Sequence, residues 1–132
     1  MDILSPGLSG ELEITASEAD TAARWGSGLI PVYSTPSMVG LMESAAVKAL
    51  EGRLPEGQTT VGGHIDVHHL AATPVGMRVR ARAELVAVEG RKLTFNIEVW
   101  DEVEKVGQAL HERFMIDTQK FMARTQAKSV GR

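Results

Sequence analysis

The sequence predicts a single α+β domain in which a five-stranded antiparallel sheet is wrapped around one long central helix. Apolar residues recur at the helical period from Tyr33 to Leu50, whereas one earlier and four later segments alternate with the period of strands. Tight turns join most of the later segments, which favours antiparallel pairing. One helix of about four turns cannot cover both faces of such a sheet, so the sheet is expected to curl around it.

Length and composition exclude several classes of protein. The 132 residues suffice for one domain, and the hydrophobic (43%) and charged (23%) fractions are ordinary for a globular chain. The net charge of −3 argues against a nucleic-acid partner, and the absence of cysteine excludes disulfides and thiolate chemistry. No apolar run approaches the ~20 residues that cross a bilayer, and no secretory signal is evident. We therefore expect a cytoplasmic protein without a membrane partner.

The elements before the central helix are short. Residues 1–9 are rich in turn formers and are expected to form a flexible lead-in to a domain spanning 10–118. Alternation in Glu11–Thr15 predicts a strand. A short helix is expected to begin at Ser17, where acidic residues follow a capping hydroxyl, and to end at Gly26.

The central helix is expected to be mostly buried. Its wide apolar arc consists of Met38, Leu41, Met42, Ala45, Ala46, Ala49 and Leu50. Ser34 or Thr35 can cap the helix by accepting from a free amide of the first turn, and Gly52 supplies the stop. Glu43 lies at the edge of the apolar arc and away from Lys48. A carboxylate in that setting is either paired or functional.

The remaining strands follow the helix. They are expected at 58–69, 77–88, 92–99 and 106–117, and residues 119–132 are expected to form a tail or a short helix. In the first of these strands, alternation places Val61, Ile65, Val67 and His69 on the apolar face. A sheet edge or face left uncovered points to a homodimer or a higher homo-oligomer.

Four motifs, taken with the order of elements, match a known family. They are Val32–Pro36 (VYSTP), Met38–Glu43 (MVGLME), Thr60–Gly62 (TVG) and His69–Gly76 (HLAATPVG). With these motifs the chain resembles the hot-dog-fold thioesterases and, within them, the fluoroacetyl-CoA-thioesterase-like family. The resemblance covers nearly all of the expected domain and implies an acyl-CoA thioesterase that hydrolyses a short-chain acyl-CoA thioester. We expect no cofactor and no metal.

The resemblance also implies roles for individual residues. The family's catalytic threonine, glutamate and histidine fall on Thr35, Glu43 and His69. The glycine whose backbone lies near the thioester falls on Gly62, and an arginine of the last strand falls on Arg113.

The chemistry of the residues agrees with part of this assignment. Thr35 lies at a helix N-terminus, where free N–H groups favour the developing oxyanion of acyl transfer. His69 is the one histidine of its cluster on the apolar face, and Gly62 and Gly63 allow close approach of a ligand to the backbone. Thr35 either attacks the thioester, activated by His69 and Glu43, or positions a water that does; the sequence leaves both routes open.

The region before the central helix bears on substrate choice. The family is associated with an aromatic lid there, whereas this chain has Trp25, Leu29 and Tyr33 and is only partly aromatic. Tyr33 is a candidate substrate-binding residue. We expect a general short-chain acyl group rather than discrimination for fluoroacetyl.

Structural alternatives compete with these roles. Thr35 alone could be a plain N-cap, and Glu43 could pair with an arginine of a neighbouring strand or subunit. His111 and Arg113 share one face of the last strand, where structural pairing competes with ligand binding.

Two clusters also have functional and structural interpretations. His64, Asp66 and His68 share a strand face and could bind a metal, although a polar outer face is the better interpretation. A row formed by Arg78, Arg80 and Arg82 could hold coenzyme A phosphates or be a solvated strand face.

Two other functions fit the same fold. A non-catalytic protein that binds acyl-CoA or another small ligand would keep the pocket without turnover. A hot-dog hydratase or dehydratase would use a histidine and a carboxylate, and Thr35 would be dispensable.

Overall fold

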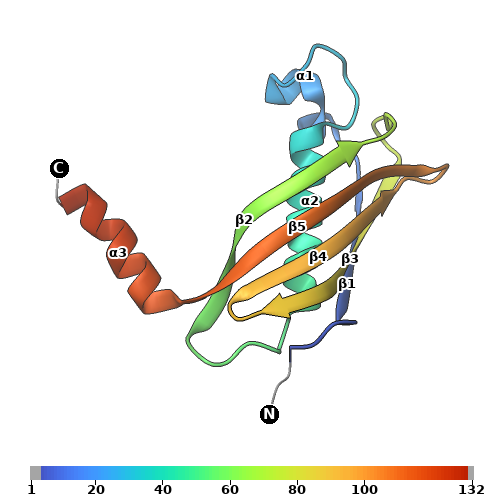
Figure 1. Cartoon of the computed structure of the whole chain (residues 1–132). Coiled ribbons are helices and arrows are strands. Elements are labelled where there is room, and N and C mark those ends of the chain that lie inside the picture. The colour runs from blue at the N-terminus through green and yellow to red at the C-terminus, as the bar shows by residue number, and fades with distance from the viewer. Residues whose placement is uncertain (1–3, 131–132) are drawn as a thin grey trace.

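The structure, a computed structural model, describes residues 4–130. In chain order its elements are β1 (Ser9–Thr15), the 3-10 helix η1 (Glu18–Asp20), α1 (Ala22–Trp25), α2 (Thr35–Ala49), β2 (Gln58–His69), β3 (Arg78–Glu89), β4 (Lys92–Trp100), β5 (Lys105–Asp117) and α3 (Thr118–Val130). Figure 1 shows the sheet curling around α2, so the predicted α+β class and architecture are confirmed.

The sheet has five antiparallel strands in the order β1-β3-β4-β5-β2. Within residues 4–130, β2 is therefore an edge strand, and its 12 residues pair on one side only, with β5. A long unpaired edge is a natural site for pairing with another chain. In the part of the chain that the structure describes, no helix is long and apolar enough to cross a membrane.

Helix α2 begins as the sequence predicts, with one of the two proposed caps selected. Ser34 is the N-cap, and its Oγ accepts from the backbone N–H of Ser37 at 3.2 Å. Thr35 is consequently the first helical residue, and its hydroxyl is not used for capping. Gly52, with φ of 74°, follows the helix end in the left-handed conformation.

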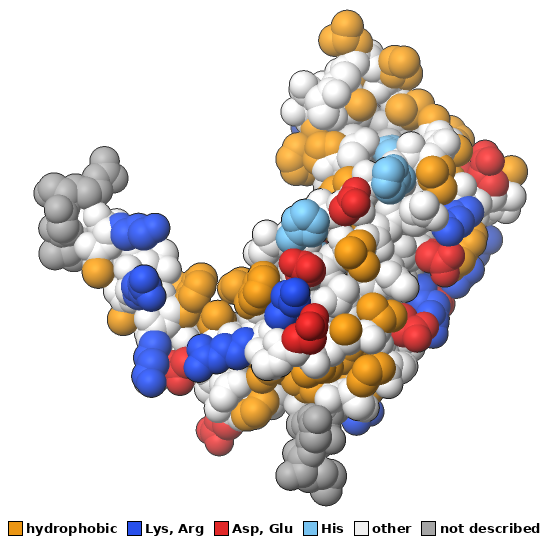
Figure 2. Space-filling view, viewed as in Figure 1, with side chains coloured by type: hydrophobic (Ala, Val, Ile, Leu, Met, Phe, Trp, Pro, Cys, Tyr) orange, Lys and Arg blue, Asp and Glu red, His pale blue; other side chains and the backbone are white. Residues whose placement is uncertain are grey.

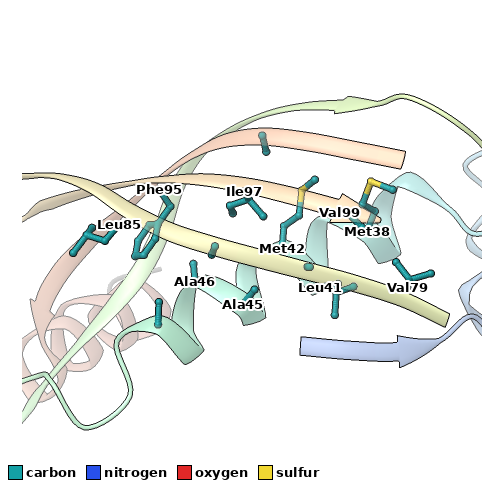
Figure 3. Packing of buried hydrophobic residues seen from close by; sticks show 14 of the residues in the cluster. Met38, Leu41, Met42, Ala45, Ala46, Val79, Leu85, Phe95, Ile97 and Val99 are labelled. Atoms are coloured by element: carbon teal, nitrogen blue, oxygen red, sulfur yellow. The ribbon is translucent and has the colours of Figure 1, made fainter. Parts of the chain in front are cut away.

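The core lies between α2 and the concave face of the sheet (Figure 3). From α2 it takes Met38, Leu41, Met42, Ala45, Ala46 and Ala49, and from β3 and β4 it takes Val79, Leu85, Phe95, Ile97 and Val99. β1 approaches α2 at Gly10, where a Cβ atom would fall on the backbone of Ala45 and Ala49. Glycine at this position allows the first strand to pack directly on the helix.

A β-bulge at Gly63 corrects one expectation. The register pairs Gly62 with Arg113 but His64 with Glu112, so β2 carries one extra residue. Thr60 and Gly62 therefore face the helix together with Ile65 and His69, and Thr60 is buried. The predicted inward position of Val61 is wrong, because simple alternation does not include the bulge.

The terminal segments add detail to the prediction. Residues 1–3 of the expected lead-in lie outside the described residues, and Leu4 is buried against the core. The short helix expected at Ser17 is divided into η1 and α1 around Thr21. Residues after Asp117 form the helix α3, which projects from the body of the domain in Figure 1.

Candidate active site

The first pair of candidate site residues joins the start of α2 to the end of β2. Thr35 Oγ1 lies 2.7 Å from His69 Nδ1, which is a short hydrogen bond. His69 is held by the pairing of β2 with β5 opposite Gly107, and the next residue, Leu70, donates its N–H to the carbonyl of Val106. Two rigid elements thus place the hydroxyl and the imidazole together.

Burial controls the charge of this pair. Burial lowers the pKa of His69 below its ordinary value of 6.5, and the nearby backbone of Ala71 opposes this effect. The imidazole is therefore neutral at pH 7, and its Nδ1 can accept the proton of the Thr35 hydroxyl when Nε2 carries the ring proton. Among residues 4–130 the buried Nε2 has no hydrogen-bond partner. The Nε2–H group of His69 thus lacks a hydrogen-bond acceptor in the described part of the chain.

A second group of candidate site residues lies further along α2. Arg113 Nη1 lies 4.0 Å from Glu43 Oε2, which confirms that an arginine of a strand pairs with this carboxylate. Arg113 is buried and donates from Nε to Thr60 Oγ1 at 2.9 Å and from Nη2 to the Thr60 carbonyl at 3.1 Å. A Cβ atom on Gly62 would lie 2.9 Å from Glu43 Oε2, so the Gly62 backbone borders the carboxylate.

His111 completes this second group. Its Nδ1 lies 2.7 Å from the carbonyl oxygen of His64, and its Nε2 lies 3.2 Å from Arg113 Nη1. Burial lowers its pKa, and the positive charge of Arg113 lowers it further. Burial also lowers the pKa of Arg113, opposed by the charge of Glu43, but an arginine remains charged throughout the useful pH range.

The two groups are separate within one chain. Glu43 follows Thr35 by eight positions on α2, a rise of about 12 Å along the helix axis. The structure thus brings Thr35 to His69, and it brings Glu43 to Gly62 and Arg113. Within one chain, it does not bring Glu43 to the imidazole of His69.

The other predicted substrate contacts lie in different surroundings. Tyr33 is buried and lines a hollow of about 370 Å³ with Ile14 and Leu41, on the β1 side of α2. Burial raises the pKa of its hydroxyl, and the charge of Asp20 raises it further. Gly63, the bulge residue, packs directly beneath the ring of Phe114 and has no room for a side chain.

The expected lid is an exposed apolar loop at the top of Figure 1. Leu29 is 96% exposed and Ile30 is 64% exposed, and Figure 2 shows hydrophobic side chains gathered there. Trp25 anchors the loop by donating from Nε1 to Ser37 Oγ at 2.9 Å. The loop therefore offers apolar surface close to the start of α2.

The structure also decides between the two interpretations of the histidine–aspartate cluster on β2 and of the arginine row on β3. His68 Nε2 lies 3.6 Å from Asp66 Oδ1 on an exposed strand face, and no group of three metal-binding side chains occurs within residues 4–130. Each arginine of the cationic row has an acidic partner, in the pairs Arg78–Glu102, Arg80–Glu11 and Arg82–Glu84. This pairing favours the solvated strand face over a phosphate site.

Sequence reasoning found the second group only in part. The structural pairing of His111 with Arg113, one of the two predicted alternatives, is confirmed. The contact of His111 with the His64 carbonyl was not predicted, and the hidden bulge concealed Thr60. The two adjacent glycines at 62 and 63, within a strand, were the available signal for the bulge.

Comparison with known proteins identifies the family. A family model described as fluoroacetyl-CoA-specific thioesterase matches residues 16–119. The fluoroacetyl-CoA thioesterase of Streptantibioticus cattleyicolor is 43% identical over 98 residues, which cover 74% of this chain and 70% of that protein.

Solved structures agree with this match. A point mutant of the fluoroacetyl-CoA-specific thioesterase, in complex with fluoroacetate and CoA, is 34% identical with a TM-score of 0.84, covering 89% of this chain and 99% of that one. A hot-dog-like protein from Thermanaerovibrio acidaminovorans is 26% identical with a TM-score of 0.88, covering 96% and 93%. The chain therefore has the hot-dog fold and belongs to the fluoroacetyl-CoA-specific thioesterase family.

Proposed function

We propose that this protein is an acyl-CoA thioesterase that hydrolyses short-chain acyl-CoA thioesters. The observation that carries the proposal is the 2.7 Å contact between the Thr35 hydroxyl and the His69 imidazole at the start of α2, in a chain of this family. A neutral imidazole bonded to a hydroxyl is the arrangement by which a weak nucleophile is activated.

In the proposed reaction, His69 Nδ1 accepts the proton of the attacking hydroxyl while a C–O bond forms at the thioester carbon. The carbonyl oxygen becomes an oxyanion, which the N–H of Gly62 from a second copy of the chain stabilises. The C–S bond then breaks, and the thiolate of coenzyme A takes the proton from His69. If Thr35 itself attacks, water hydrolyses the resulting ester; if Thr35 positions the water, the carboxylic acid forms directly.

A homodimer would complete this site. We propose that two copies of the chain pair antiparallel through the free edges of their β2 strands, about a two-fold axis at Asp66. Because the bulge at Gly63 takes one residue out of register, Gly62 of a second copy then lies opposite His69. Glu43 of that second copy borders its own Gly62, so it comes within reach of Nε2 of His69 in the first copy. This Nε2 is the buried atom that has no hydrogen-bond partner among the described residues. The resulting Thr35–His69–Glu43 site orients the imidazole through a carboxylate, as in other acyl-transfer sites.

The packing behind the pair supports a short acyl group. Met38 of α2 packs directly against Gly107, the strand partner of His69, and Met38 is fully buried. The interior therefore leaves little depth for a long acyl chain, whereas the exposed loop around Leu29 can cover a small one. The cytoplasmic location stays a prediction from the sequence.

The activity is tested by measuring free thiol release from a panel of acetyl, branched, long-chain and aromatic acyl-CoAs. Thr35→Val, which removes the hydroxyl but keeps the shape, and Glu43→Gln serve as matched variants. Release from short acyl-CoAs that collapses in both variants is expected. Binding of acyl-CoA without release would instead identify a ligand-binding protein, and hydration of enoyl-CoA by Thr35→Val would identify a hydratase.

The shared site is tested by mixing the two inactive variants under conditions of subunit exchange. A heterodimer of Thr35→Val with Glu43→Gln would contain one intact site if Thr35 and Glu43 act from different copies. Random exchange should then restore about a quarter of the wild-type activity. No recovery despite proven exchange would show that each site belongs to one chain.

A further inference from the structure

We propose that His111 is a positioning residue for thioester hydrolysis, which holds the Gly62 segment of β2 and the Arg113 guanidinium in one fixed arrangement. The proposal rests on the proposed function and adds to it a residue that does not touch the substrate. Its basis is a buried imidazole that is bonded on both nitrogens, on one side to the bulge and on the other side to Arg113.

The partners of His111 fix its tautomer. A carbonyl oxygen can only accept, so the 2.7 Å contact with the His64 carbonyl requires a proton on Nδ1. A guanidinium can only donate, so the 3.2 Å contact with Arg113 Nη1 requires a lone pair on Nε2. Only the neutral imidazole with its proton on Nδ1 satisfies both contacts.

The surroundings of the ring favour this neutral form. The ionisable groups that face it are Arg113 on β5, Glu43 on α2 and His64 on β2, and the ring of Phe95 on β4 lies 6.3 Å away, centre to centre. Burial lowers the pKa of His111, and Arg113 adds to this effect, whereas Glu43 opposes it. Protonation would place an N–H against the N–H of Arg113 and break the contact.

Each contact of His111 leads to a different part of the proposed site. The His64 carbonyl belongs to the bulge that turns Gly62, the proposed oxyanion donor, toward α2. Arg113 in turn lies against Glu43, the carboxylate proposed to orient the catalytic imidazole. One side chain therefore connects the backbone donor to the carboxylate.

Three substitutions separate the two contacts. His111→Asn keeps a donor near the position of Nδ1, His111→Gln keeps an acceptor near the position of Nε2, and His111→Phe keeps neither. We expect kcat to fall about tenfold in each of the first two variants and about a hundredfold in the third, with KM within about twofold of wild type. Activities are normalised to the folded fraction, measured by circular dichroism.

A double-mutant cycle with Arg113→Met identifies the route of each effect. The loss caused by His111→Asn should vanish in the Arg113→Met background, since that contact is already absent, whereas the loss caused by His111→Gln should persist. A purely structural role would lower the melting temperature of all three variants while kcat per folded molecule stays within twofold of wild type. That result, or additive losses from His111→Asn and Arg113→Met, would overturn the proposal.

One measurement is independent of turnover. Nitrogen-15 NMR of the imidazole in the unliganded wild type should report His111 protonated on Nδ1 at pH 7. A proton on Nε2 would refute the positioning role even if the protein is an active thioesterase. Absence of acyl-CoA hydrolysis by a wild type with the Nδ1 proton would instead refute the proposed function.

Discussion

The two polar groups along α2 differ in how completely they are bonded. In the group around Arg113, both the guanidinium and the His111 imidazole have hydrogen-bond partners within the chain, and both residues are buried. The Thr35–His69 pair has one internal hydrogen bond, an exposed hydroxyl and a buried nitrogen without a partner among the described residues. The saturated group is suited to holding geometry, whereas the open pair is suited to meeting another molecule.

The largest expected effect comes from the open pair. His69→Ala should lower kcat/KM for the preferred acyl-CoA about a thousandfold, because it removes the proposed base. Steady-state thiol release measures this effect. The midpoint of urea unfolding should change little, since the imidazole has one hydrogen bond inside the chain. Near-normal turnover by His69→Ala would refute its catalytic assignment, and Thr35→Ser, which keeps a hydroxyl, is the control expected to retain activity.

The saturated group should show the opposite pattern in stability. Arg113→Met leaves the Thr60 hydroxyl and His111 Nε2 without their shared partner, which should lower the free energy of unfolding by about 2 kcal/mol. Urea denaturation of this variant beside His69→Ala gives the comparison. Equal destabilisation by the two substitutions would remove the distinction between the groups.

A smaller effect on stability distinguishes Thr35 from its neighbour Ser34. Ser34→Ala removes the N-cap of α2 and should lower the free energy of unfolding by about 1 kcal/mol. Thr35→Val leaves the cap in place and should change stability by less than about 0.5 kcal/mol, while it abolishes turnover. Thermal unfolding of the two variants tests this, and the reverse order would identify Thr35 as the structural residue.

The smallest expected effect concerns pH. Because burial lowers the pKa of His69, the acid limb of kcat/KM should lie below pH 6.5. His69 and His111 both have lowered pKa values, so the unfolded chain binds more protons than the folded one as the pH falls below 6.5. Stability should therefore be fully present above pH 6.5 and decline below it. Unfolding that becomes harder as the pH falls through this range would contradict both assignments.

Much of the fold could be predicted because its patterns are local. The 58–69 strand has the predicted bounds, and the apolar arc of α2 is the buried face that the helical period indicates. Position 61 was misplaced because two glycines carry no hydrophobic signal, and one extra residue reverses alternation.

The site was less predictable because it depends on distances between elements. The sequence named Thr35, Glu43 and His69 through a resemblance, but the rise of a helix already separates the first two by about two turns. No pattern within the chain specifies which surface of a second copy faces His69. His111 escaped because its importance comes from two partners on different strands, one of them a backbone carbonyl.

The bulge at Gly63 finally affects how sequences of relatives are compared with this one. The spacing from Gly62 to His69 includes one residue that contributes no step to the ladder, so the count itself carries structural information. An alignment that opens a one-residue gap between these positions would exchange inward and outward residues on one side of the gap. Relatives should therefore be aligned with this interval kept intact, even where the intervening residues differ.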